Sequence, residues 1–298
     1  MVIALDIHAF STAEEIKKGW SRDKKYKVEK DGVEYLLRVS DISLYEGKKY
    51  EFEMMRQLSL LGVPMCKPVA FDADMKSVYI LLSWIEGEDL KEIIGRYDDE
   101  SQYAFGIESG QILKKIHSIK TPADISDWET RYNAKIDRKI QAYKNCGLEY
   151  EKVSPFLEYI EANRHLLKDR PQTYQHGDYH IGNIMLDKNG KLAVIDFNRH
   201  DYGDPWEEFN RIVWSAQVSP FFASGMVDGY FDREVPKLFW RLLALYISSN
   251  TVSSLPWAIP YGEGEINTMR KQAREVLSWY NDMKTFFPSW YEKPITGK

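Results

Sequence analysis

The 298-residue sequence has little cysteine and no long hydrophobic stretch. Its two cysteines, Cys66 and Cys146, have no Cys or His neighbours at zinc-ligand spacing, and so few thiols are typical of a reducing compartment. No apolar run approaches the roughly 20 residues that a membrane-spanning helix needs. The first residues have no basic segment and reach Asp6 early, so we expect no secretory signal. We therefore expect a cytoplasmic protein with no membrane partner.

The sequence also lacks an excess of positive charge. The sequence has 40 Lys and Arg residues against 45 Asp and Glu residues, which gives a net charge of −5. Proteins that bind nucleic acid rely on clustered Lys and Arg to neutralise phosphates, so we expect no nucleic-acid partner. A mildly acidic chain is compatible with a cationic substrate, although a net charge this small does not establish one.

Three widespread catalytic motifs do not occur in the sequence. These are G-x-x-x-x-G-K-[ST], H-E-x-x-H and G-x-S-x-G. Their absence removes the usual P-loop, zinc-protease and α/β-hydrolase interpretations. The composition, with 44% hydrophobic and 29% charged residues, is otherwise that of an ordinary globular protein, and the length allows one large domain or two modest ones.

The most informative stretch covers residues 175–197, which read Q-H-G-D-Y-H-I-G-N-I-M-L-D-K-N-G-K-L-A-V-I-D-F. Two short apolar runs, 184–186 and 192–195, are separated by polar turn residues, and Gly190 can adopt the positive φ that a tight turn requires. This pattern predicts a β-hairpin.

Three side chains with oxygen donors would gather at one end of this hairpin. Asp178 and Asn183 precede its first strand, and Asp196 follows its second strand. Magnesium ions held against the phosphates of a nucleotide take oxygen ligands of this kind. An ordinary acidic hairpin is the alternative, but the full set of residues around the two strands favours a magnesium site.

The same stretch resembles the aminoglycoside phosphotransferase family, whose members share the protein-kinase-like fold. Protein kinases carry H-R-D-x-x-x-x-N and, after a short hairpin, D-F-G. Here residues 176–183 read H-G-D-Y-H-I-G-N and residues 195–197 read I-D-F. The resemblance implies that Asp178 is the catalytic base and that Asn183 and Asp196 are the magnesium ligands.

The resemblance extends into the N-terminal part of the chain. Arg38, on a strand predicted at 33–39, stands where kinases carry a lysine that contacts the α- and β-phosphates and pairs with a helix glutamate. The resemblance implies that Arg38 takes this role and that Glu51, on a helix predicted at 48–61, is its partner. Glu53 is the competing partner, and a surface position for Arg38 is the alternative interpretation.

Three more positions follow from the resemblance alone. His180 stands near the place of a kinase lysine close to the transferred phosphate, which implies a catalytic role. The carbonyl of Ser83 and the amide of Ile85 would face the purine of the nucleotide, with a plain connection between a strand and a helix as the alternative. A loop at 19–21 would cover the phosphates, although it lacks the glycine-rich motif of protein kinases.

Local patterns predict the remaining elements. A capping-box pattern predicts a helix near residues 11–15. After Asp204 and Pro205, which suit the N-cap and the first helical position, a helix is predicted from Trp206, and the resemblance implies that its acidic start braces the catalytic loop. The other predicted elements are strands at 25–29, 65–71 and 77–82, and helices at 90–94, 103–119, 130–147, 151–168, 231–250 and 265–287.

We therefore predict a bilobal, protein-kinase-like α+β fold. An N-lobe with a mainly antiparallel sheet and a helix would cover residues 1–85. A larger, mostly helical C-lobe with the catalytic loop, the metal site and the acceptor pocket would cover residues 86–298.

The predicted activity is Mg²⁺-dependent transfer of the γ-phosphoryl group of ATP or GTP to a hydroxyl of a small molecule. The resemblance favours an aminoglycoside-type antibiotic, and hence a role in antibiotic resistance. The alternatives are a macrolide, choline, a sugar or an amino alcohol as acceptor, or a nucleotide-binding pseudoenzyme. Aromatic residues near carboxylates in the last ninety residues would suit an amine-bearing acceptor, with core packing as the alternative.

Overall fold

The computed structural model describes residues 10–17 and 23–294 and divides the chain into two compact units. Unit 1 consists of residues 1–92 and 183–200, and unit 2 of residues 93–182 and 201–298. The loop at 19–21, which was predicted to cover phosphates, lies outside the described residues. The domain boundary predicted after residue 85 stays a prediction.

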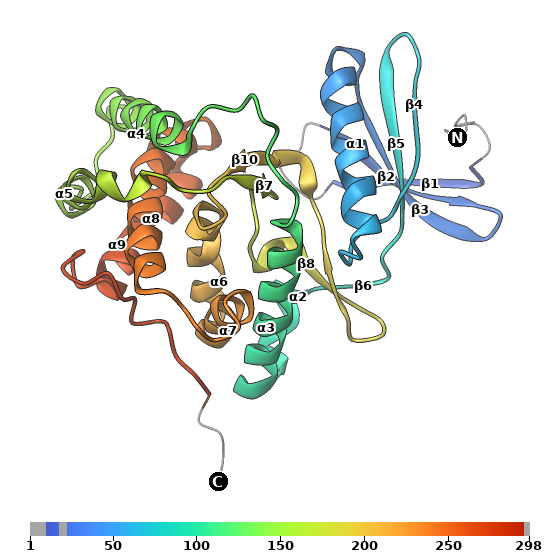
Figure 1. Cartoon of the computed structure of the whole chain (residues 1–298). Coiled ribbons are helices and arrows are strands. Elements are labelled where there is room, and N and C mark those ends of the chain that lie inside the picture. Colours follow the sequence, from blue (N-terminus) through green and yellow to red (C-terminus); the bar gives the residue numbers. More distant parts are fainter. Residues whose placement is uncertain (1–9, 18–22, 295–298) are drawn as a thin grey trace. The chain divides into compact units, whose positions relative to one another are not determined.

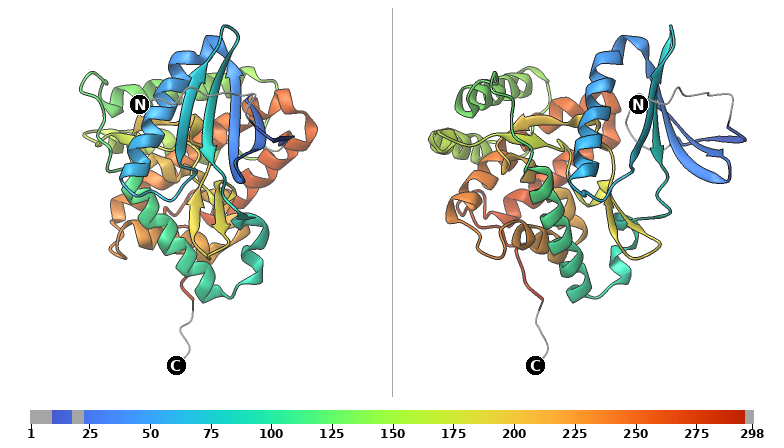
Figure 2. Two further views of the ribbon diagram at one scale, coloured as in Figure 1. Left: turned by 90° about the vertical axis from the view of Figure 1, so that its right-hand side faces the viewer. Right: turned by 45° about the vertical axis from the view of Figure 1, so that its right-hand side comes forward.

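The first unit is built on a five-stranded antiparallel sheet in the order β1-β2-β3-β5-β4. Helix α1 (Tyr45–Leu60) lies along one face of this sheet (Figures 1 and 2). The strands are β1 (Thr12–Glu15), β2 (Lys24–Lys30), β3 (Val33–Asp41), β4 (Pro68–Ala73) and β5 (Ser77–Ser83).

The register of this sheet decides which side chains meet α1. Side chains alternate between the two faces of a strand, and Val78, Ile80 and Leu82 of β5 are all buried. Arg38 of β3 is directly opposite Ile80. Arg38 therefore shares a face with these apolar residues, and the structure pairs it with Glu51 of α1.

The helix predicted near residues 11–15 is wrong. These residues form β1, whose register runs antiparallel to β2 from Thr12 opposite Glu29 to Glu15 opposite Tyr26. A segment this short cannot sustain a helix by itself, because helix nucleation is costly, and the neighbouring strand offers its backbone hydrogen-bond partners instead. The capping pattern was a local signal that sheet pairing overrode.

The predicted hairpin is confirmed. β8 (Ile184–Asp187) pairs with β9 (Leu192–Val194), and both join β6 (Gly87–Asp89) in a three-stranded sheet in the order β6-β8-β9. Gly190 adopts φ 72°, as the turn requires. This sheet belongs to the first unit.

The second unit is mostly helical, with a short antiparallel pair formed by β7 (Thr173–Gln175) and β10 (Asp201–Gly203). Helices α4, α5 and α9 each pack against α8, and α3 lies beside α7 (Figure 1). The helices are α3 (Asp99–Ile116), α4 (Trp128–Asn145), α5 (Ser154–Asn163), α6 (Ile212–Val218), α7 (Pro220–Tyr230), α8 (Lys237–Ala258) and α9 (Glu263–Trp279), while α2 (Leu90–Ile93) spans the boundary between the units.

Helix boundaries in the last ninety residues differ from the predicted ones. The predicted helix 231–250 begins only at Lys237, and α9 ends at Trp279 rather than at residue 287. Consecutive left-handed residues interrupt the chain at both places: Asp232 and Arg233 before α8, and residues 281–283 after α9. Helix α7 was missed, because its nearly continuous burial leaves no polar face to produce a helical period.

The aromatic residues of these helices mostly form the core. Phe222, Tyr230 and Trp240 are buried, whereas Trp257 and Tyr261 are exposed. Core packing, the alternative named for this region, is therefore the role of the buried set. Across the described residues, we find no helix with the length and apolarity needed to cross a membrane.

Candidate active site

The loop at residues 176–182 follows β7 in the second unit and carries Asp178 and His180. His176 and Tyr179 are fully buried on either side of Asp178, whose side chain keeps 19% of its surface exposed. Gly177 adopts φ 84°, a conformation that favours glycine. The loop thus anchors its flanking side chains in the core and leaves the Asp178 carboxylate accessible.

A buried glutamate braces this loop from the following helical segment. Glu208, on the 3₁₀ helix Glu207–Arg211, accepts hydrogen bonds from Gly177 N–H at 3.0 Å and from Tyr179 N–H at 3.3 Å. Burial alone would raise the pKa of Glu208, but the nearby imidazoles of His117 and His176 and the Gly177 N–H hold it below its ordinary value. The bracing role predicted for this acidic segment is confirmed for Glu208.

The start of this segment differs from the prediction. The 3₁₀ helix begins at Glu207 rather than at Trp206, and Pro205 lies outside it. The buried carboxylate of Asp204 accepts a hydrogen bond from Trp206 N–H at 3.0 Å, but it also binds Arg170 and Tyr246. Asp204 therefore connects distant parts of the second unit instead of acting only as a cap.

Two basic side chains lie next to the Asp178 carboxylate. Arg211 Nε is 3.4 Å from Asp178 Oδ1, and His180 Nε2 is 3.8 Å from the same atom. The other ring nitrogen of His180 accepts a hydrogen bond from Gly182 N–H at 3.1 Å, which orients the imidazole. Sequence reasoning missed Arg211. Its spacing from Glu208, three residues on the same short helix, is the signal that points to it.

Asn183 and Asp196 come together in the first unit. Ile195 N–H donates to the carbonyl of Asn183 at 3.0 Å, which closes the open end of the β8–β9 hairpin. Asp196 follows directly, in the left-handed conformation (φ 67°, ψ 59°) that is uncommon outside glycine. An amide and a carboxylate at adjoining strand ends are hard oxygen donors, so this pair fits the chemistry of Mg²⁺.

A buried ionic network surrounds Arg38 in the first unit. The guanidinium donates from Nη1 to Glu51 at 2.5 Å, and from Nε to Asp23 at 3.1 Å. Lys48 of α1 lies 2.6 Å from Asp23 and 3.2 Å from Glu51. We call these four residues the Arg38 network. The predicted pairing with Glu51 is present, whereas Asp23 and Lys48 were not predicted.

Asp23 is strongly stabilised as a carboxylate in this network. Burial would raise its pKa, but Arg38 and Lys48 together lower it to about 2. Ser40 adds a hydrogen bond from its hydroxyl to Asp23 Oδ1 at 2.8 Å. With only 4% of the Arg38 side chain exposed, the network is nearly sealed on the arginine side, and Lys48, at 11%, is slightly more accessible.

The residues predicted to contact a purine lie at the end of β5. Ser83 closes the strand, and its backbone and hydroxyl are both hydrogen-bonded to the backbone of Lys67 at 2.8 Å. Ile85 belongs to no strand and sits between β5 and β6. Lys27 stacks on the ring of the intervening Trp84 at 4.9 Å. Ser83 is thus firmly placed, while the role of both residues towards a nucleotide stays a prediction.

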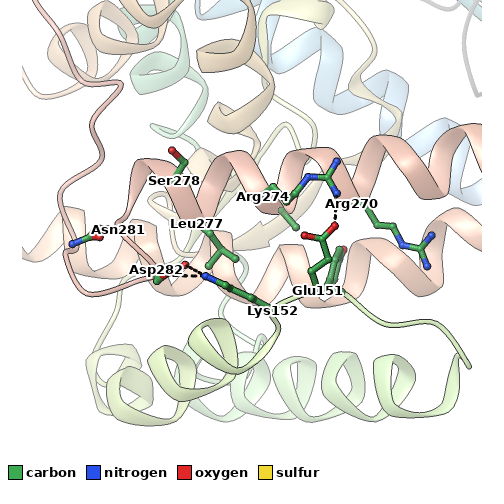
Figure 3. Close-up of a pocket in the computed structure, with 10 residues that line it drawn as sticks. Glu151, Lys152, Arg270, Arg274, Leu277, Ser278, Asn281 and Asp282 are labelled. Atoms are coloured by element: carbon green, nitrogen blue, oxygen red, sulfur yellow. Dashed lines mark hydrogen bonds and ion pairs between the residues drawn. The ribbon is translucent and has the colours of Figure 1, made fainter.

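A separate surface groove of about 430 Å³ lies along α9 in the second unit (Figure 3). Its charged side chains are largely paired with one another, through Arg274 with Glu151 and Lys152 with Asp282. None of the residues predicted for the active site lines it. Exposed, mutually paired charges contribute little specificity, so we do not assign the groove to the reaction.

Comparison with known proteins identifies the fold. The family model described as the phosphotransferase enzyme family matches residues 12–239. No curated protein matches the chain by sequence. Among solved structures, the chain is similar to a thermostable mutant of aminoglycoside phosphotransferase APH(4)-Ia in ternary complex with ADP and hygromycin B. The TM-score is 0.64 at 16% identity over 90% of this chain and 94% of that chain.

Two further solved structures are similar to the chain in fold. Spectinomycin phosphotransferase APH(9)-Ia, in complex with ADP and spectinomycin, has a TM-score of 0.61 at 15% identity over 89% of both chains. A candidate fructosamine-3-kinase from Haemophilus somnus has a TM-score of 0.63 at 12% identity over 90% of this chain and 92% of that chain. The predicted kinase-like fold is confirmed. Sequence identities this low do not indicate which acceptor the chain uses.

Proposed function

The chain belongs to the phosphotransferase enzyme family, and from this premise we propose that it transfers the γ-phosphoryl group of ATP or GTP to a hydroxyl of a small molecule. The observation that carries the proposal is the continuous run from the braced Asp178 loop to the Asn183–Asp196 hairpin end. It supplies an accessible carboxylate and a pair of magnesium-type oxygen ligands in one stretch of chain. Family members with ADP and small-molecule acceptors support the same activity.

The residues would divide the work between metal binding and acceptor activation. Asn183 and Asp196 would hold Mg²⁺, which when bound neutralises charge on the phosphates. Asp178 would orient the acceptor hydroxyl and take its proton as the bond to phosphorus forms. His180 would keep its imidazole beside this carboxylate. Since phosphoryl transfer has a loose transition state, such positioning supplies most of the catalysis.

The nucleotide would be held by residues of the first unit. Arg38, fixed by Glu51, would face the α- and β-phosphates, and Lys48 of the same network is a second cation for this task. The Ser83 carbonyl and the Ile85 amide would bind the purine. The residues leave ATP and GTP equally possible as donors, so both belong in the assay.

The activity is tested by measuring nucleotide consumption with ATP and GTP across aminoglycosides, macrolides, sugars, choline and amino alcohols. With the best acceptor, Asp178→Asn should lower kcat by about 10²-fold or more, because it removes the proton acceptor, while nucleotide affinity is retained. Asp124→Asn, a change at an exposed loop carboxylate, is the matched control and should be silent. Full turnover by Asp178→Asn would refute the base assignment.

A further inference from the structure

Three cationic side chains lie near one another in the second unit, and one of them, Arg211, contacts Asp178. Arg211 contacts Asp178 directly at 3.4 Å. Four residues earlier, at the start of the same 3₁₀ helix, Glu207 pairs with Lys135 of α4 at 3.3 Å. Lys139 follows Lys135 by one helical turn, and both ammonium groups lie over the ring of Tyr132, at 5.4 and 5.9 Å. We call Lys135, Lys139 and Arg211 the cationic cluster.

Lys139 is the unusual member of this cluster. Its only hydrogen-bond partner is the hydroxyl of Ser249 on α8, at 3.4 Å, and no carboxylate lies within ion-pair distance among the described residues. Burial, together with the positive charge of Lys135, lowers its pKa to about 7, against the opposing attraction of Glu207 and with a smaller contribution from Arg211. The surroundings of Lys139 therefore disfavour its charged form.

The cationic cluster has one more charged group than the carboxylates that pair with it. With Lys139 protonated, the cationic cluster carries three positive charges, and the two carboxylates that pair with it are those of Glu207 and Asp178. Glu207 also accepts a hydrogen bond from the side-chain amide of Gln175, so its carboxylate does not serve the cationic cluster alone. A half-buried ammonium without a counter-ion costs folding free energy, so its presence in a cluster that contacts Asp178 through Arg211 calls for an anionic ligand.

We propose that the phosphoryl acceptor carries an anionic group, a carboxylate or a phosphate, which Lys139, Lys135 and Arg211 bind while Asp178 engages its hydroxyl. The proposal rests on the proposed function and names the substrate class of that site. A polycationic aminoglycoside would meet repulsion at the same place, so the proposal replaces the acceptor class predicted from the sequence. One guanidinium and two ammonium groups can bind either a carboxylate or a phosphate.

A matched set of hydroxyl acceptors tests the charge preference. Glucose is neutral, glucosamine is cationic, and gluconate and glucose 6-phosphate are anionic, while all four are small polyhydroxy compounds, and kanamycin adds a polycation. With Mg²⁺ and ATP or GTP, we expect transfer to gluconate or glucose 6-phosphate at least 10-fold faster, in kcat/KM, than to the neutral and cationic compounds. The two anions separate a carboxylate site from a phosphate site. Transfer confined to glucosamine or kanamycin overturns the proposal and leaves the proposed function intact.

A second arm tests the residues with whichever acceptor is used. Lys139→Met should raise KM for an anionic acceptor about 10-fold or more, with little change in kcat and none in KM for the nucleotide. Lys144→Met, which removes an exposed lysine near the end of the same helix, is the matched control. An unchanged acceptor KM in Lys139→Met would contradict the proposal.

A third arm does not depend on turnover. We expect gluconate or glucose 6-phosphate to raise Tm of the wild type but not of Lys139→Met, while glucosamine raises neither. This pattern without any phosphoryl transfer would support the anion site and count against the proposed function. Equal Tm shifts in the wild type and Lys139→Met would overturn the anion site.

Discussion

At the scale of single residues, the Arg38 network joins charged side chains that lie far apart in the sequence. Arg38 was predicted to pair with Glu51, and it does, but two of its three side-chain hydrogen bonds go to Asp23. Asp23 shares no periodic pattern with either residue. Only the placement of β2 next to β3, with α1 on the face of Arg38, brings the network together.

The carboxylate of Asp23 makes stability depend on acid pH. Its pKa in the folded protein is about 2, below the ordinary value of 3.8, so its stabilisation is complete above about pH 4 and is lost as the pH falls towards 2. Asp23→Asn should therefore cost about 2 kcal/mol at pH 7, by the linkage between pKa and stability. Urea denaturation at pH 7, 5 and 3 measures the difference, which should shrink at pH 3. A difference independent of pH would rule out this origin.

At the scale of elements, the contact between α3 and α7 supports the Asp178 loop. Gly106 and Gly110 of α3 face Gly225 and Gly229 of α7, and these glycines leave the two helix backbones in direct contact. Ser109, beside them on α3, accepts the Tyr179 hydroxyl at its carbonyl, at 2.8 Å. The helix pair thus supports the Asp178 loop through the hydrogen bond between Tyr179 and Ser109 of α3.

Substitution of one of these glycines should damage the helix pair. A Cβ at Gly110 would lie 2.1 Å from the Met226 carbonyl oxygen, so the helices would have to separate. We expect Gly110→Ala to lower the free energy of unfolding by about 3 kcal/mol or more, at the upper end of overpacking effects, as measured by urea denaturation. Gly95→Ala, where a Cβ meets nothing within 4 Å, is the control. Equal stability of the two variants would contradict the close packing.

At the scale of the whole molecule, ligand binding should be visible as thermal stability. Magnesium with ATP or GTP, at about 100 times its Kd, should stabilise the wild type by about 2.7 kcal/mol. Asp196→Ala should lose the magnesium-dependent part of this shift, because it removes one predicted metal ligand. Differential scanning fluorimetry with nucleotide, with and without EDTA, makes the comparison. A magnesium-dependent shift that survives in Asp196→Ala would exclude Asp196 as a ligand.

Local sequence patterns predicted the elements near the site well, because these elements depend on residues that are neighbours in the sequence. The β8–β9 hairpin follows from two apolar runs and a glycine turn, and α1 from its apolar spacing. The wrong predictions concern elements that depend on contacts with distant parts of the chain. Residues 11–15 became a strand because β2 offered backbone partners, and α7 was missed because burial on nearly all sides removes the period on which prediction depends.

The sequence by itself determined the family, the hairpin and the oxygen-bearing side chains at its end, because those features depend on neighbours along the chain. Only the tertiary structure decided which charged side chains contact one another. Lys139 contacts Ser249, which is 110 positions away in the sequence. Asp178 contacts Arg211, which lies on the 3₁₀ helix Glu207–Arg211. The packing of the helices determines which of these side chains meet. It therefore also determines their burial and the local balance of charge, on which the proposed acceptor class depends.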